Sequence, residues 1–161
     1  MNLEKYQQYS RIARGLEKAD LVLKDARIVN VFTEEIIRGD IAIQDGIIAG
    51  IGSFHGKEER DLAGRYVCPG FIDSHLHLES TLVTPAELVT VASRHGTTTF
   101  IVDPHESANV SGLAGIDYIL EQTEDVKANV YVMMPSCVPA TGIDDNGCTL
   151  TAQDMAPYLN N

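Results

Sequence analysis

After Pro69, segments rich in β-branched residues alternate with amphipathic ones, and no other feature restricts the fold of this chain as much. Residues 97–102 read TTTFIV and residues 129–134 read NVYVMM, and both compositions are typical of buried strands. Between them, apolar residues recur at helical spacing over 113–120, which predicts a helix. Strands that alternate with helices pair in parallel, so this part of the chain is expected to adopt an α/β fold.

A further strand and helix precede these elements. The stretch GFIDSHLHL, residues 70–78, predicts a buried strand. Thr84, Pro85 and Glu87 then form a capping box with proline in the first helical position, and Gly96 marks the end of that helix. Residues 70–161 therefore contain three predicted strands and two predicted helices, and the stretch from Pro135 to about 150 is expected to be loop.

Residues 19–69 have a different pattern, with the period of two that half-buried strands show. The stretch LVLKDARIV alternates, Asp45-Gly46 lies between two isoleucine-rich runs as in a tight hairpin, and GRYVCPGF predicts one more strand. A short amphipathic helix is expected before them, with its apolar face formed by Leu3, Tyr6, Ala13 and Leu16. We therefore predict two domains, a helix plus a small all-β unit over 1–69 and an α/β unit over 70–161.

Charge and cysteine content exclude several classes of partner. The chain has 12 Lys and Arg against 23 Asp and Glu, a net charge of −11, which argues against nucleic acid and anionic membranes and leaves a small-molecule substrate as the expected partner. The three cysteines include no C-x-x-C pair, so reduced thiols are expected rather than disulfides. There is no apolar signal segment and no stretch of ~18 apolar residues, so we expect a cytoplasmic protein.

Two of the five histidines, His75 and His77, lie one residue apart near the end of a predicted strand. Side chains alternate across a strand, so Asp73, His75 and His77 are expected on one face, where two imidazoles can bind one divalent ion. An H-x-H pair alone is weak support, since such pairs also arise by chance. Its position at a strand-to-loop junction strengthens the metal hypothesis, because βα barrels place their chemistry at the carboxyl ends of the strands.

A second polar cluster follows the strand at 97–102. Asp103, His105 and Glu106 occupy the corresponding place, and Pro104 turns the chain there. Ionisable groups at this position suit support of a metal, proton transfer or substrate binding. The alternative is that Asp103 caps a turn and the other two side chains lie in solvent.

The remaining candidates are weaker. His55 is expected in a surface loop, and His95 in the last turn of a helix, where the dipole favours a cation. Cys137 follows the third predicted strand, so it either lines the same pocket or packs as a small apolar residue. No role is assigned to Glu79, which follows His77 by two positions.

Three stretches carry a family resemblance: PGFIDSHLHLES, HGTTTFIVDPHESANV and NVYVMMPSCVPAT. The first resembles the opening barrel strand of the amidohydrolase superfamily, and the set is similar to the bacterial adenine deaminase family in particular. The resemblance runs from about residue 19 to 141. It implies that His75 and His77 are metal ligands and that Asp103, His105 and Glu106 belong to the active-site segment.

The resemblance also implies a fold and cofactors. The expected architecture is the N-terminal part of a composite fold, a small β-sandwich subdomain followed by the first three βα units of a (β/α)8 amidohydrolase barrel. Manganese or iron is the expected metal, with zinc as an option, and the full-length form is expected to be a homo-oligomer. Since a barrel needs roughly 250 residues and 161 − 69 = 92 follow Pro69, we expect one portion of a longer enzyme. Four side chains should lose burial without the missing strands: Ile72, Phe100, Val130 and Val132.

The implied reaction is the hydrolytic deamination of adenine to hypoxanthine and ammonia, with a hydroxide activated by the metal and a carboxylate that shuttles a proton. Two alternatives stay open. One is another cyclic amide or amidine hydrolase of the superfamily, such as a dihydroorotase-like or imidazolonepropionase-like enzyme. The other is a non-catalytic fragment that binds only metal or a partner.

Overall fold

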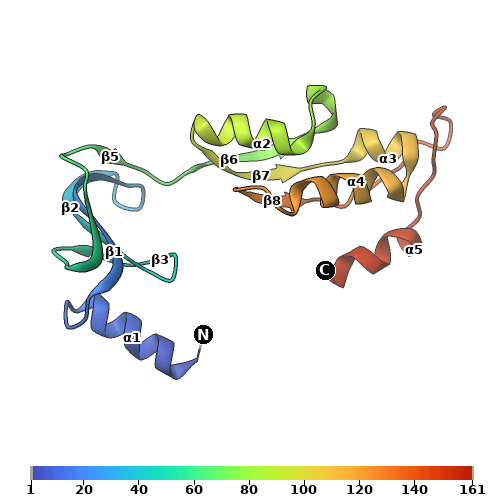
Figure 1. The fold of residues 1–161 in the computed structure, drawn as a ribbon. Coiled ribbons are helices and arrows are strands. Elements are labelled where there is room, and N and C mark those ends of the chain that lie inside the picture. The colour runs from blue at the N-terminus through green and yellow to red at the C-terminus, as the bar shows by residue number, and fades with distance from the viewer. Residues whose placement is uncertain (1, 161) are drawn as a thin grey trace. The chain divides into compact units, whose positions relative to one another are not determined.

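A computed structural model describes residues 2–160 and divides the chain into two compact units, one up to Pro69 and one from Gly70 (Figure 1). Each unit has its own sheet and its own hydrophobic core. Among the described residues, no helix has both the length and the apolarity that crossing a membrane requires.

The first unit is a five-stranded sheet with one helix. Its strands follow the order β3-β2-β1-β4, with the short β5 also paired to β1. Neighbours β1–β2 and β2–β3 are antiparallel, whereas β4 and β5 run parallel to β1. The element bounds are α1 Leu3–Ala13, β1 Ala19–Asn30, β2 Glu35–Gln44, β3 Ile47–Gly52, β4 Gly56–Asp61 and β5 Tyr66–Val67.

The hairpin predicted at Asp45-Gly46 is confirmed. It joins β2 to β3, and both residues have a positive φ, +51° and +75°. Two successive positive φ values are what a two-residue turn between twisted strands requires, and Asp-Gly adopts them at little cost.

The predicted apolar face of the first helix is wrong. Helix α1 ends at Ala13, and Leu3 and Tyr6 are 70% and 64% exposed. The side chain that reaches the core is Ile12, which is fully buried with Ala19, Val22, Ala42 and Phe54. A single buried position is enough to dock a short helix on a sheet edge, and periodicity did not identify which position it would be.

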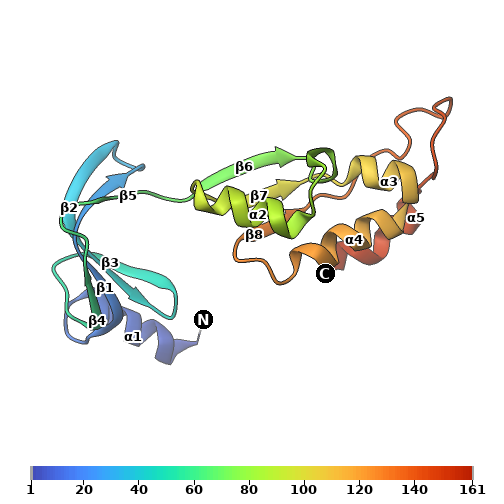
Figure 2. The same ribbon diagram turned by 45° about the horizontal axis from the view of Figure 1, so that its top comes forward.

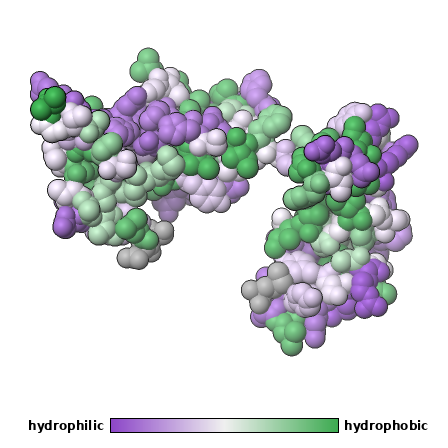
Figure 3. Space-filling model, turned by 180° about the vertical axis from the view of Figure 1, so that it is seen from behind, coloured by the Kyte–Doolittle hydropathy of each residue, from purple (hydrophilic) through white to green (hydrophobic). Residues whose placement is uncertain are grey.

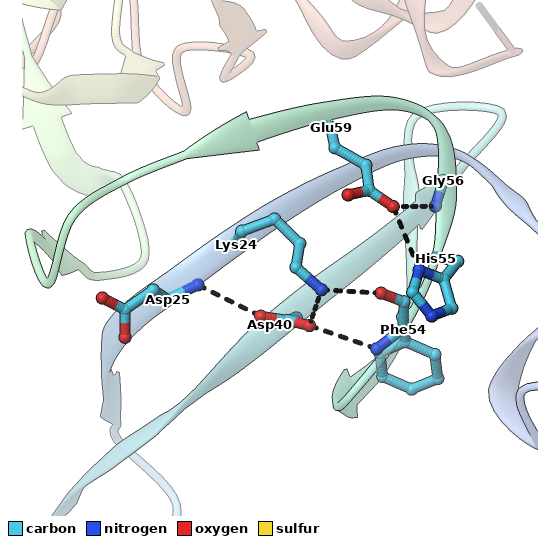
Figure 4. A network of polar contacts seen from close by, with 7 residues as sticks. All are labelled: Lys24, Asp25, Asp40, Phe54, His55, Gly56 and Glu59. Atoms are coloured by element: carbon cyan, nitrogen blue, oxygen red, sulfur yellow. Dashed lines mark hydrogen bonds and ion pairs between the residues drawn. The ribbon is translucent and has the colours of Figure 1, made fainter.

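A carboxylate inside the first unit ties three segments together (Figure 4). Asp40 on β2 accepts hydrogen bonds from Lys24 Nζ at 2.5 Å, from the Asp25 amide at 3.1 Å and from the Phe54 amide at 3.2 Å. Lys24 Nζ also donates to the Phe54 carbonyl at 2.8 Å. Burial alone would raise the pKa of Asp40, but the bond from Lys24 and the two backbone amides outweigh it and lower that pKa.

Replacing Asp40 by Asn is therefore expected to destabilise the protein by about 1–3 kcal/mol, because Lys24 and a backbone amide lose their charged acceptor. A group whose pKa is lowered by folding stabilises the native state above its unfolded pKa, ~3.9, and loses that contribution as pH falls. The difference between wild type and Asp40→Asn in urea unfolding should thus be full at pH 7 and shrink below about pH 4.

The matched control is Asp25→Asn. Asp25 pairs with Arg38 at 2.7 Å, but that pair is exposed, and asparagine tolerates its φ of +50°. We expect a much smaller loss of stability there. Equal losses of unfolding free energy in the two variants would show that burial of the Asp40 network adds nothing to the stability of the protein.

The second unit is a three-stranded parallel sheet, in the order β6-β7-β8, with helices between the strands (Figure 2). The strand at 97–102 is confirmed as β7, and the helix capped by Thr84 is confirmed as α2, after which Gly96 has a φ of +101°. The bounds are β6 Phe71–Leu76, η1 Glu79–Thr81, α2 Pro85–Arg94, β7 Thr97–Val102, α3 His105–Ser111, α4 Leu113–Thr123, β8 Asn129–Val132, α5 Ala152–Met155 and η2 Ala156–Asn160.

Helices α2 and α4 cover one face of this sheet. Phe100 and Val102 of β7 are buried there against Val89 and Ile119, so the expectation that Phe100 loses burial is wrong. Val130 and Val132 are half-buried on the same side. Ile72 is 63% exposed, as expected. Other large apolar side chains are also exposed in each unit (Figure 3).

Candidate metal centre

The carboxyl ends of β6 and β7 lie side by side, because the two strands are paired in parallel. Leu76 pairs with Val102, and the Asp103 amide donates to the Leu76 carbonyl at 2.9 Å. Since Leu76 and Val102 face the helices, alternation turns His75 and Asp103 to the face of the sheet that α2 and α4 leave uncovered. His77 follows directly after β6. The local sequence thus brings three potential ligands to one sheet end.

His75, His77 and Asp103 form a compact group. The Nε2 atoms of the two histidines are 3.3 Å apart, with ring centroids at 5.0 Å and the rings nearly perpendicular at 78°. Each residue, Asp103 included, offers a ligand atom within 4.8 Å of those of the others. Ligand nitrogens ~2.0–2.1 Å from one ion lie about 3 Å apart, so the separation fits a shared divalent ion. Two imidazoles and a carboxylate suit manganese, iron and zinc alike.

Two polar atoms in this group are buried and have no hydrogen-bond partner in the described part of the chain. They are Asp103 Oδ1 and His77 Nδ1. Buried polar atoms normally have partners, so each such atom calls for an explanation. A cation beside Asp103 would explain the unpartnered Oδ1. The two imidazoles and the carboxylate are therefore consistent with a metal centre.

A second group shares His77 and adds two glutamates. His77, Glu79 and Glu106 offer ligand atoms within 4.8 Å of one another. Glu79 Oε1 accepts from the amides of Glu106 at 3.0 Å and Ser107 at 3.1 Å, at the start of α3. The hydroxyl of Ser80 donates to Glu106 Oε2. The segment after β6 therefore holds the first turn of α3 through a carboxylate and a hydroxyl.

Other candidates lie outside both groups. His105 begins α3 but belongs to neither. His55 is an exposed partner of Glu59, 3.4 Å away, and His95 is the exposed C-cap of α2. Cys137 is exposed, so packing does not explain it.

What sequence reasoning missed is the role of Glu79 and Ser80 beside the candidate site. Helix α3 begins at His105, and its N-cap, Pro104, offers no side-chain acceptor, so its amides need an acceptor from elsewhere. The need for such an acceptor is apparent only once α3 is known, because the sequence predicts a turn at Pro104 rather than the start of a helix.

Comparison with known proteins identifies the family and the relatives of this chain. The amidohydrolase family matches residues 66–157. The adenine deaminase of Desulfitobacterium hafniense is 56% identical over all 161 residues, which cover 28% of that protein. Those of Clostridium acetobutylicum and Geobacillus kaustophilus are 51% and 50% identical over 92% and 89% of this chain, with 26% and 25% of their own lengths covered. The chain thus spans about a quarter of the curated relatives it matches.

One solved structure shares the fold at low sequence identity. It is the N-acyl-D-glutamate deacylase of Bordetella bronchiseptica, complexed with zinc and a phosphonate inhibitor. The match has a TM-score of 0.56 at 20% identity and covers 89% of this chain and 35% of that one. The family match over most of the second unit, together with histidines at a parallel strand end, leads to one conclusion: the chain belongs to the amidohydrolase family.

Proposed function

We propose that this chain is part of a metal-dependent hydrolase that deaminates adenine to hypoxanthine and ammonia. The observation that carries the proposal is the group of His75, His77 and Asp103 at the carboxyl ends of two parallel strands. Identities of 50–56% to adenine deaminases support the choice of substrate.

In the proposed mechanism, His75 and His77 would hold the metal, since their Nε2 atoms lie 3.3 Å apart. A divalent ion bound there supplies Lewis-acid activation of water. Asp103 contributes negative charge beside the pair, which favours cation binding. Glu106 carries the proton between water and the leaving amino group, and Ser80 holds its carboxylate in place. His105, one residue earlier, is proposed to contact the substrate.

The finer architecture is also a proposal. The two units would be a β-sandwich subdomain over 1–69, completed by later parts of the protein, and the first three βα units of a (β/α)8 barrel over 70–161. Among the described residues the first unit has a single sheet and the parallel sheet is open. We further propose manganese or iron as the metal, homo-oligomeric assembly and a cytoplasmic location.

The test is a substrate panel on the complete product of the gene that encodes this chain. Loaded with Mn²⁺, Fe²⁺ or Zn²⁺, the protein is expected to release ammonia from adenine. Its kcat/KM for adenine should be at least about a hundredfold above that for dihydroorotate or imidazolonepropionate. A site that hydrogen-bonds the polar edge of one substrate rejects analogues that leave the polar groups of the site unpaired.

Comparable turnover of a cyclic amide would instead favour the other superfamily hydrolases. Metal binding without turnover of any of the three substrates would favour the non-catalytic alternative. A protein that neither binds metal nor turns over adenine would contradict the proposal at its base.

A further inference from the structure

Glu79 belongs to the second group, with His77 and Glu106, and its two carboxylate oxygens are in different situations. Oε1 accepts from the Glu106 and Ser107 amides at 3.0 and 3.1 Å. Oε2 is buried and has no hydrogen-bond partner among the described residues. Oε1 therefore has a role, as a cap for α3, whereas the role of the buried Oε2 is unexplained.

His77 presents the complementary group. Its Nε2 lies 3.3 Å from Nε2 of His75, on the side where the metal is proposed, while Nδ1 is buried and finds no partner within residues 2–160. A ring nitrogen of His77 lies within 4.8 Å of a carboxylate oxygen of Glu79. His77 Nδ1, a potential donor, and Glu79 Oε2, an acceptor, thus belong to neighbouring side chains.

Metal ligation decides which nitrogen of His77 carries the proton. If Nε2 gives its lone pair to an ion, Nδ1 must carry the hydrogen and becomes a donor. Metal-binding histidines almost always donate this hydrogen to a carboxylate, carbonyl or water, which fixes the ring and the tautomer. Catalytic hydrogen bonds are often long in the free protein and tighten on binding, and rotation of two neighbouring side chains can bring such a pair together.

We propose that Glu79 is a positioning residue that accepts a hydrogen bond from His77 Nδ1 through Oε2 while its Oε1 caps α3. The inference rests on the proposed function, because it takes His77 as a metal ligand. One carboxylate then sets both the orientation of a ligand and the place of the Glu106 segment, so that metal and proton carrier keep a fixed geometry.

The variant Glu79→Gln separates these two roles. Glutamine has the same shape but only one acceptor oxygen, and the α3 amides require it. Its NH₂ group then faces His77 Nδ1 and makes that atom an acceptor, which moves the proton to Nε2 and blocks metal ligation. Glu79→Ala removes both roles, since it also leaves the α3 amides without an acceptor.

The experiment uses the complete gene product with selectively ¹⁵N-labelled histidine, and the His77→Ala variant identifies the His77 signals. In the metal-free protein, at a pH where the ring is neutral, we expect the Nδ1–H tautomer in wild type and its loss in Glu79→Gln. Mn²⁺ and Zn²⁺ affinity should fall about 10–100-fold in that variant. Glu79→Ala should bind metal as weakly and also have a lower Tm than Glu79→Gln, because the α3 amides lose their acceptor.

The matched control is Glu87→Gln, an exposed acid-to-amide change in the first turn of α2, which should alter neither tautomer nor affinity. The inference is overturned if Glu79→Gln keeps the Nδ1–H tautomer, or if its metal affinity stays within twofold of Glu87→Gln. A wild-type protein that binds no metal would also overturn it. If metal binding responds as expected but adenine is not deaminated, only the proposed substrate fails.

Discussion

Replacing His75 and His77 together by alanine is expected to remove bound divalent metal from the complete gene product and to reduce adenine deamination to background. The two Nε2 atoms, 3.3 Å apart, are the only pair of ring nitrogens that the described residues bring together. Without them, Asp103 is the one ligand of this group left among the described residues, and the ion loses both of its nitrogen ligands. Elemental analysis after dialysis measures the metal directly.

The control is His95→Ala, which removes an exposed imidazole at the end of α2. It should keep full metal content and activity. Because His75 is exposed and His77 only half-buried, the double variant should remain folded by circular dichroism. Undiminished metal content in the double variant would remove the pair from the site.

The strand β7 and the helix α2 could be predicted because their signals are local. TTTFIV has almost no alternative to a strand, and the Thr84 cap followed by Pro85 fixes a helix start within the residues themselves. Helix α3 had no such signal. Its N-cap is Pro104, and the acceptor for its first amides comes from Glu79, 27 and 28 residues away in sequence from the two donors. A helix cap that comes from a residue distant in sequence cannot be predicted from local sequence patterns.

The same distinction explains what was predicted of the site. His75 and Asp103 meet because strands paired in parallel end at the same edge, and this follows from the order of strands and helices alone. Which face the helices would cover did not follow. Phe100 was expected to lose burial, yet it lies under α2 and α4 and is 1% exposed. Alternation separates the two faces of a strand but does not say which of them meets a helix.

Replacing Glu106 by Gln in the complete gene product is expected to lower kcat for adenine by about 10²–10⁴-fold, the usual contribution of a general acid–base group. The side chain is exposed at the start of α3, and Ser80 donates a hydrogen bond to one of its oxygens. Glutamine can keep that bond through its amide oxygen but cannot accept and release a proton, so position is preserved and chemistry is lost.

Metal content separates this effect from damage to the metal centre. Glu106 shares a group with His77 and Glu79 but not with His75 and Asp103, so the proposed ion keeps its ligands in Glu106→Gln, and metal content should stay near the wild-type level. Glu87→Gln, in the first turn of α2, should leave kcat unchanged. A kcat near wild type in Glu106→Gln would reduce Glu106 to a carboxylate whose charge merely suits the positive end of α3, and the proton carrier would then have to be sought among the residues that complete the site.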